Sequence, residues 1–384
     1  MPPKDRSYAQ RQATVKLIGS LLIDKYKYPK IIYTPNDIIG DMNKQYGLQM
    51  TYMQAWRSKE YAVQVLRGNP SESYEKLLSY IYMLVLTNPM SVVSLKQPEE
   101  DLFMYAFVAL YPSIKGWQYC KPVVVVDVTF LKSAYKGTLL IASTQDPAGN
   151  ILPLAYAIVD SENNASWEWF FARFKDAFGE MEGMCIVLDR HEGIENAAAT
   201  LYPQVPHCVY IWHLWNNVKK NYKKNHLLLK DIFFAMAKAY TVEKFDYHMA
   251  EVEKIYKRVK DYLMNVGYER WSREHSTVNR TLTMTSNIAE SISAALKAAM
   301  ELPVLPFLDY IRKLIGRWNV TNLKNAVESF TNLGKKYDTM LMDNLELSHQ
   351  MKVTPSTSYL YSVLDKGKQR IMFLKDRTCS YRSF

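Results

Sequence analysis

The chain has 384 residues, 48% of them hydrophobic and 22% charged, and a formal net charge of +10. These proportions exclude a disordered chain, and the length predicts two or three domains. The basic excess favours nucleic acid over a membrane surface as partner. Four scattered cysteines without a CxxC pair argue against a disulfide framework and favour a reducing compartment. We expect a soluble intracellular protein, because the N-terminus is polar and no apolar run approaches the ~18 residues of a membrane span.

Residues 1–100 are predicted to form an all-α N-terminal region, with three helices over 8–68 and further helix over 69–100. The helix ends coincide with typical capping residues, namely Thr34 with Pro35, Gly47, Thr51 with Gln54, and Gly68. The turn GLQMT has the length of a helix-turn-helix connection. Helix 52–67 would then present Tyr52, Gln54 and Arg57 to DNA. The alternative is a small helical bundle without a ligand.

The pattern changes to strands from residue 102. We predict, in chain order, strands at 121–132, 137–144 and 150–160, a helix at 166–179, a strand at 183–189, a helix at 190–202 and a strand at 207–212. Three strands followed by helix, strand, helix and strand is the order of a ribonuclease-H-like α/β fold, in which the first and fourth strands are neighbours.

Each of these neighbouring strands brings an acid, Asp127 within the first and Asp189 at the end of the fourth. Four valines lead into Asp127, and burying a lone carboxylate in such a strand costs several kcal/mol unless it is paired. Asp189 ends the fourth strand. Two adjacent carboxylates repel each other without a cation, so a shared metal ion would explain both. The alternatives are a buried acid satisfied by its neighbours at Asp127, and a helix cap completed by Glu192 at Asp189.

The rest of the chain is predicted to be mostly helical up to about residue 330. It includes a basic stretch at 216–226, a long exposed helix at 241–266, a helix at 285–300 with a possible cap at Asn287, and an amphipathic helix at 306–318. Beyond 330 the pattern weakens, and 351–384 is expected to contain loops with short strands.

The string DVTFLKSAYKGTLLIASTQDPAGNILPLAYAIVDSENNASWEWFF, together with VLDRHEGI, HLWNN at 213–217 and TSNIAES, resembles plant Mutator-like element (MULE) transposases. The resemblance covers roughly 10–330. It implies a ribonuclease-H-like catalytic core at 101–330 with a helical insertion at about 213–284. It also implies a DDE triad on Asp127, Asp189 and Glu290, which would use Mg²⁺ or Mn²⁺ to cut and join DNA. Val128 replaces a glycine and Leu188 a serine of the family's usual motifs.

Two further departures concern zinc. The family usually carries C-x-x-H before the helical insertion, but Tyr210 stands in place of the cysteine and only His213 matches. In the tail, 331–384, Cys379 resembles the opening of a SWIM-type zinc finger whose other ligands do not follow. We therefore expect no complete zinc site, and a truncated or domesticated copy that lacks the N-terminal zinc module.

The expected mechanism is two-metal phosphoryl transfer, with Asp127 bridging two ions roughly 3.5–4 Å apart and Asp189 and Glu290 on either side. The candidate DNA contacts are Lys132, Arg190, His213, Lys219, Lys220, Lys223, Lys224 and Arg57. The lysines could equally form a solvated face, and His213 could be a metal ligand or a core residue. Glu290 could simply cap a helix with Asn287.

Asp160 and Glu162 are the competing acids for a metal role. They rank below the triad because we expect the third strand to run antiparallel to the first. The overall expectation is a nuclear DDE transposase that acts on double-stranded DNA. The sequence leaves open whether it forms homo-oligomers and whether it is a degenerate copy without activity. Plant far-red-responsive transcription factors resemble the same transposases, so the alternative is a non-enzymatic, transposase-derived DNA-binding regulator. A third interpretation is a scaffold for an intact transposase.

Overall fold

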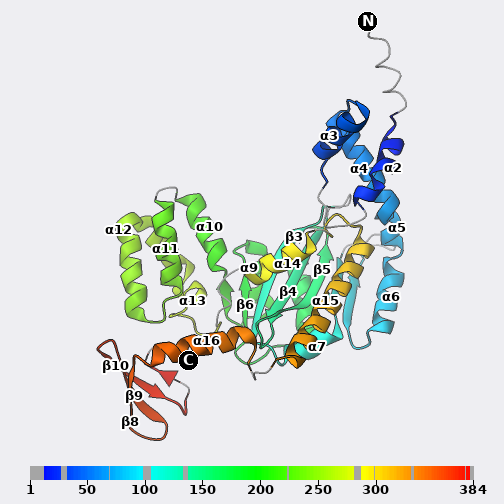
Figure 1. The fold of residues 1–384 in the computed structure, drawn as a ribbon. Coiled ribbons are helices and arrows are strands. Elements are labelled where there is room, and N and C mark those ends of the chain that lie inside the picture. The colour runs from blue at the N-terminus through cyan, green and yellow to red at the C-terminus, as the bar shows by residue number, and fades with distance from the viewer. Residues whose placement is uncertain are drawn as a thin grey trace.

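The computed structural model describes residues 13–26, 33–68, 70–97, 105–132, 137–222, 225–280, 287–297, 299–329, 333–376 and 378–380. A seven-stranded sheet lies at the centre (Figure 1). Helices α2–α4 lie beyond one end of it, a group of helices lies beside it, and a small second sheet lies near the C-terminus. The protein is therefore of the mixed α/β class.

The N-terminal helices are α2 (Val15–Tyr26), α3 (Pro35–Tyr46), α4 (Tyr52–Arg67), α5 (Pro70–Glu75) and α6 (Leu77–Thr87). Both predicted N-caps are confirmed. Thr34 and Thr51 each accept a hydrogen bond from the backbone three residues ahead, and Asp37 and Gln54 complete the capping boxes. Gly47 ends α3 in the left-handed conformation that glycine adopts without strain.

The central sheet contains β1 (Val92–Lys96), β2 (Tyr105–Ala109), β3 (Val123–Phe130), β4 (Thr138–Gln145), β5 (Ile151–Val159), β6 (Cys185–Leu188) and β7 (His207–Val209). Their order is β1-β2-β5-β4-β3-β6-β7. The expected neighbours are confirmed, because β3 and β6 pair in parallel. The prediction that 92–96 is helical is wrong, since VVSLK pairs with β2 as an edge strand.

The expected direction of the third strand is also wrong. β3 pairs antiparallel with β4, and β4 antiparallel with β5. Two reversals make β5 parallel to β3, so the C-terminal ends of both strands lie at the same edge of the sheet. Asp160 and Glu162, which follow β5, therefore lie at the edge that carries Asp127.

Helices cover both faces of the sheet. One face packs against α7 (Tyr111–Trp117), α8 (Asn164–Phe178) and α9 (Glu192–Leu201), and the other against α6, α14 (Asn287–Leu296) and α15 (Val304–Val327). Side chains alternate along a strand. Val124 and Val126 face the first layer, and Val123 and Val125 the second. Asp127 follows Val125 by two positions and so belongs to the α14 and α15 face.

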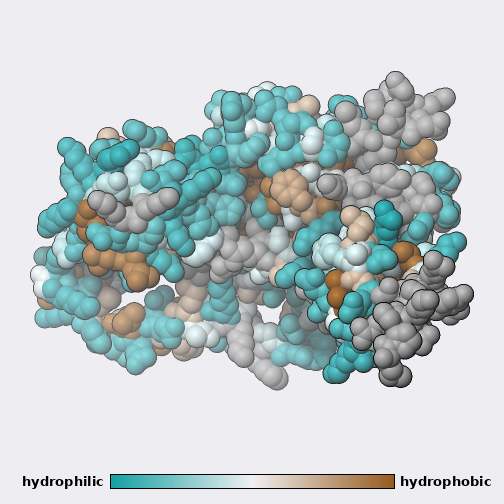
Figure 2. All heavy atoms as spheres, turned by 90° about the horizontal axis from the view of Figure 1, so that it is seen from above, coloured by the Kyte–Doolittle hydropathy of each residue, from teal (hydrophilic) through white to brown (hydrophobic). Residues whose placement is uncertain are grey.

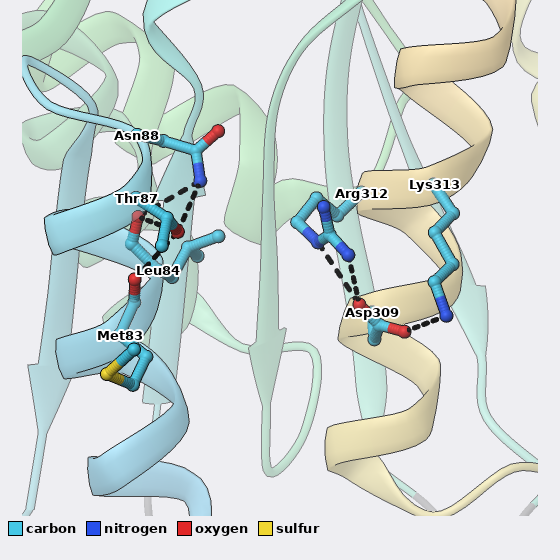
Figure 3. Close-up of polar contacts among 7 residues, drawn as sticks. All are labelled: Met83, Leu84, Thr87, Asn88, Asp309, Arg312 and Lys313. Carbon is cyan, nitrogen blue, oxygen red and sulfur yellow. Dashed lines mark hydrogen bonds and ion pairs between the residues drawn. The ribbon is translucent and has the colours of Figure 1, made fainter.

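Polar contacts within α6 and within α15 are shown in Figure 3. On α15, Asp309 pairs with Arg312 at 2.7 Å and with Lys313 at 2.7 Å. At the end of α6, the Thr87 hydroxyl donates to the Met83 carbonyl at 2.7 Å. Among the described residues, no helix is long and apolar enough to cross a membrane.

The helical insertion contains α10 (Ile211–Asn221), α11 (His226–Ala237), α12 (Val242–Val266) and α13 (Tyr268–Trp271). These helices share their own apolar core. The expectation that 241–266 is an exposed helix is wrong for one face, because Phe245, Met249 and Val252 are buried there. The many charged residues at the other positions led to the expectation of a fully exposed helix.

The C-terminal part contains α16 (Lys335–Ser348), β8 (Lys352–Pro355), β9 (Leu360–Asp365), β10 (Lys368–Phe373) and β11 (Thr378–Cys379). The expected short strands form a four-stranded sheet of order β11-β10-β9-β8. Helix α16 was not predicted. The small sheet lies beside the helical insertion, where Arg370 pairs with Glu243 of α12 at 3.7 Å (Figure 1).

Candidate active site at one edge of the central sheet

Asp127 and Asp189 lie at the same edge of the sheet, on the adjacent parallel strands β3 and β6. Val125 is paired with Val187, and each acid follows its valine by two residues. The strand pairing therefore brings together two carboxylates that are 62 positions apart in the sequence.

The Asp127 carboxylate is largely removed from water. Burial raises its pKa above the ordinary value of 3.8, and the negative charge of Asp189 raises it further. The backbone N–H of Val128, the charge of His213 and the hydroxyl of Ser293 on α14 act in the opposite direction without cancelling the rise. In the protein alone, the surroundings therefore disfavour the ionised form of Asp127.

Asp189 has the opposite tendency. Burial alone would raise its pKa, but a hydrogen bond and charge from His213 outweigh it, and the pKa falls below 3.8. The His213 Nδ1 atom lies 3.0 Å from Oδ1 of Asp189, and the Arg190 backbone N–H donates to the same oxygen at 2.7 Å. The first turn of α10, which follows β7 directly, places His213 here. His213 is therefore a partner of the acid rather than a core residue.

Helix α14 lies over the end of β3. Ile288, Ile292 and Leu296 pack into the core under it, and Ser293 on an adjacent side bonds to Asp127. Glu290 precedes Ser293 by three residues, so its backbone lies one helical turn from the contact with Asp127. The side chains of Glu290 and Asn287 lie outside the described residues, and so does the predicted capping box, although α14 does begin at Asn287.

Tyr210 is the residue of this site whose role the sequence did not indicate. Its side chain is only 1% exposed, and its hydroxyl has no hydrogen-bond partner among the described residues. The ring centroid lies 5.1 Å from that of His213. Burial raises the pKa of the phenol, as do the charges of Asp127 and Asp189. The sequence marked Tyr210 only as a substitute for cysteine, and it carried no signal for Ser293.

The two acids fit a divalent cation of the Mg²⁺ type, which prefers carboxylate oxygens. The raised pKa of Asp127 and the unpartnered Tyr210 hydroxyl both indicate that a polar group belongs beside them. The described side chains contain no cluster of three or more His, Cys, Asp or Glu arranged to hold a metal. Glu290 stays a prediction as the third carboxylate, because its side chain lies outside the described residues. The thiols of Cys208 and Cys185 contact each other.

The competing acids face the other layer of helices. Asp160 bonds with Tyr105, and Glu162 accepts a hydrogen bond from the indole of Trp167 at 3.3 Å. Glu162 also lies 3.6 Å from His191. Their lower rank therefore rests on the face they occupy, and not on strand direction.

Two of the predicted DNA contacts, Lys132 and Arg190, closely follow the acids in the chain. Lys132 is exposed just after β3, and its backbone N–H donates to the Met300 carbonyl at 2.8 Å. The Arg190 guanidinium donates to the Tyr262 hydroxyl at 2.7 Å, while its Nε has no partner among the described residues. Lys219 and Lys220 are exposed in the last turn of α10. Lys223 and Lys224 lie outside the described residues.

Arg57 is exposed on α4, farther from the acids. The neighbouring Lys59 pairs with Glu301 at 3.1 Å, which ties α4 to the segment after α14. Seen from above, the surface over the helical insertion is mostly hydrophilic, with separate apolar patches (Figure 2).

Comparison with known families gives one matching domain and one similar protein. The profile of the MULE transposase domain matches residues 123–217, from β3 into α10, which include Asp127, Asp189, Tyr210 and His213. The chain carries a MULE transposase domain. The protein is also similar to FAR1-related sequence 4 of Arabidopsis thaliana, with 19% identity over 201 residues. That match covers 51% of this chain and 28% of the relative. The resemblance to plant MULE transposases is thereby confirmed, while Glu290 lies beyond the matched domain.

Proposed function

We propose that the MULE transposase domain is a ribonuclease-H-like core of the DDE type that cleaves and joins double-stranded DNA in the nucleus. One observation carries the proposal: Asp127 within β3 and Asp189 directly after β6 lie at matching positions of neighbouring parallel strands, on the side covered by α14. Strands β5-β4-β3-β6-β7 follow the order that the sequence pattern predicted for this fold. Fold alone does not decide function, so the proposal rests on the acids.

The side chains divide the work as follows. Asp127, Asp189 and Glu290 hold Mg²⁺ or Mn²⁺. When bound, such ions activate water or a DNA 3′-hydroxyl and stabilise the leaving oxygen. His213 orients Asp189 and keeps it ionised, and Ser293 orients Asp127.

The cations bind DNA phosphates without reading sequence. Arg190 directly follows Asp189, and Lys132 is exposed just after the strand that carries Asp127. Lys219 and Lys220 continue the basic surface along α10. Such contacts contribute affinity that weakens as salt displaces the protein from the phosphates.

A strand-cleavage assay on plasmid duplex with Mg²⁺, Mn²⁺ or EDTA tests the proposal. Glu290→Gln should abolish metal-dependent cleavage at an unchanged melting temperature, because a neutral amide is a poor Mg²⁺ ligand. Glu162→Gln is the matched control, since it makes the same change at the same sheet edge on the opposite face, and it should keep cleavage. Equal activity of Glu290→Gln and the wild-type chain would remove Glu290 from the site.

A second candidate is a transposase-derived DNA-binding regulator without catalysis, and the surface of α4 favours it. The first half of this helix exposes Tyr52, Met53, Trp56 and Arg57, while Ala55 and Ser58 face α2 and α3. A short helix pair with an exposed aromatic and basic second helix suits the major groove of DNA.

This candidate predicts DNA binding in a chain that does not cut. Arg57→Ala should weaken binding by about tenfold without lowering the melting temperature. Lys44→Ala, an exposed cation on α3, is the control. If both variants bind DNA like the wild-type chain, α4 is not a DNA-reading helix. Metal-dependent cleavage by the wild-type chain would decide for the enzyme.

A further inference from the structure

The Tyr210 hydroxyl is in an unfavourable position for the protein alone. It lies in a side chain that is 1% exposed and finds no hydrogen-bond partner among the described residues. A buried hydroxyl without a partner destabilises the folded state, because it has lost its hydrogen bonds to water. The ring itself packs into the core under α14 with Ile288 and Ile292. A phenylalanine would fill that space, so packing does not require the hydroxyl.

The surroundings show what the hydroxyl is near. The charges of Asp127 and Asp189 raise the pKa of the Tyr210 phenol after burial, which is the largest cause. The centroid of the Tyr210 ring lies 5.1 Å from that of the His213 ring. Both acids already receive donors from the protein: Asp127 from Ser293 and Val128, and Asp189 from His213 and Arg190. The hydroxyl therefore remains available to whatever the two acids hold.

We propose that Tyr210 is a positioning residue of the cation site, whose hydroxyl oxygen accepts a hydrogen bond from a water molecule on the divalent ion held by Asp127 and Asp189. The inference rests on the proposed function, which assigns the ion to these acids. Mg²⁺ and similar ions keep several waters when bound by few carboxylates, and these waters are strong donors. Such outer partners typically change metal affinity by about 10–100-fold.

Isothermal titration calorimetry of the full chain with Mn²⁺, in the absence of DNA, tests this proposal. Tyr210→Phe removes only the hydroxyl and should weaken Mn²⁺ binding by about tenfold. In EDTA its melting temperature should not fall and should rise by about 1–2 °C, because an uncompensated buried group has been removed. A purely structural hydroxyl would give the reverse result, a lower melting temperature with unchanged Mn²⁺ affinity.

Tyr202→Phe is a matched control within the same chain. Tyr202 is also fully buried, and its hydroxyl also lacks a partner among the described residues, but it packs among aromatic rings on the opposite face of the sheet. This variant should show the same change of melting temperature in EDTA and bind Mn²⁺ as the wild-type chain does.

Each outcome decides a different point. Wild-type affinity in Tyr210→Phe overturns the role of Tyr210 and leaves the cation site in place. A fall of its melting temperature in EDTA also overturns it, because the hydroxyl would then be bonded within the protein. If Asp127→Asn binds Mn²⁺ as well as the wild-type chain, the cation site of the proposed function fails, and the inference fails with it.

Discussion

The two faces of the central sheet are built from alternate residues of the same strands, yet they differ in chemistry. On the face toward α8, the side chains of Trp167, Phe170, Phe171 and Phe174 are completely buried, and neighbouring rings lie with centroids 5.8–6.2 Å apart. On the face toward α14, the strands carry Asp127 beside the apolar core. One layer of the protein is thus wholly apolar at its centre, and the other contains a desolvated carboxylate.

The largest effect should come from the aromatic face. Phe171→Ala removes a fully buried ring and should lower the free energy of unfolding by about 3–5 kcal/mol. Phe130→Ala makes the same change at a ring that is 61% exposed on β3 and should stay within about 0.5 kcal/mol. Urea denaturation measures both. Similar losses at the two positions would show that the aromatic layer is not the source of stability.

The acidic face should respond in the opposite direction. Asp127→Asn removes a desolvated charge and should raise the free energy of unfolding in EDTA by about 1 kcal/mol at neutral pH. Asp146→Asn is the control, because that acid accepts hydrogen bonds from Asn150 at 2.8 and 2.9 Å in the β4–β5 turn and should not stabilise when neutralised. A clear loss of stability in Asp127→Asn would mean that the carboxylate is well paired without a cation.

The pH dependence separates the two acids. The pKa of Asp189 is lowered, so its advantage over Asp189→Asn is present above the ordinary value of 3.8 and disappears as the pH falls through the lowered pKa. The pKa of Asp127 is raised, so the wild-type chain matches Asp127→Asn below 3.8 and becomes less stable than it as the pH rises through the raised pKa. Unfolding midpoints between about pH 3 and 7 measure both trends. If both stability differences changed with pH in the same direction, the opposite pKa shifts of Asp127 and Asp189 would be contradicted.

The smallest effect concerns the basic surface. Replacing Lys219 and Lys220 with alanine should lower the salt slope of DNA binding by up to about two units, with no change of melting temperature. The same double change at Lys368 and Lys375, exposed on the C-terminal sheet, is the control. An unchanged slope at 219 and 220 would leave those lysines as a solvated face.

Local patterns predicted much of the chain well. The ends of α3 and α4 were placed by Thr34, Gly47 and Thr51, because capping depends on residues within one helical turn. Strand β3 followed from its valine run. The misses include β1, α16, the buried face of α12 and the direction of β5. β1 exists through pairing with a distant strand, and a short segment does not encode its partner.

The sequence by itself predicted which two acids lie together. A carboxylate after four valines, a second acid at a later strand end and a connection order that makes those strands neighbours were enough to predict Asp127 beside Asp189. Only the tertiary structure decided the surroundings of that pair. It placed His213 beside Asp189 and Ser293 beside Asp127. It also put Asp160 and Glu162 on the opposite face of the sheet, and it left the Tyr210 hydroxyl buried without a partner among the described residues. The physical reason is range: caps and strand periodicity act between near neighbours in the chain, whereas burial and hydrogen bonding at the site depend on how separate elements pack.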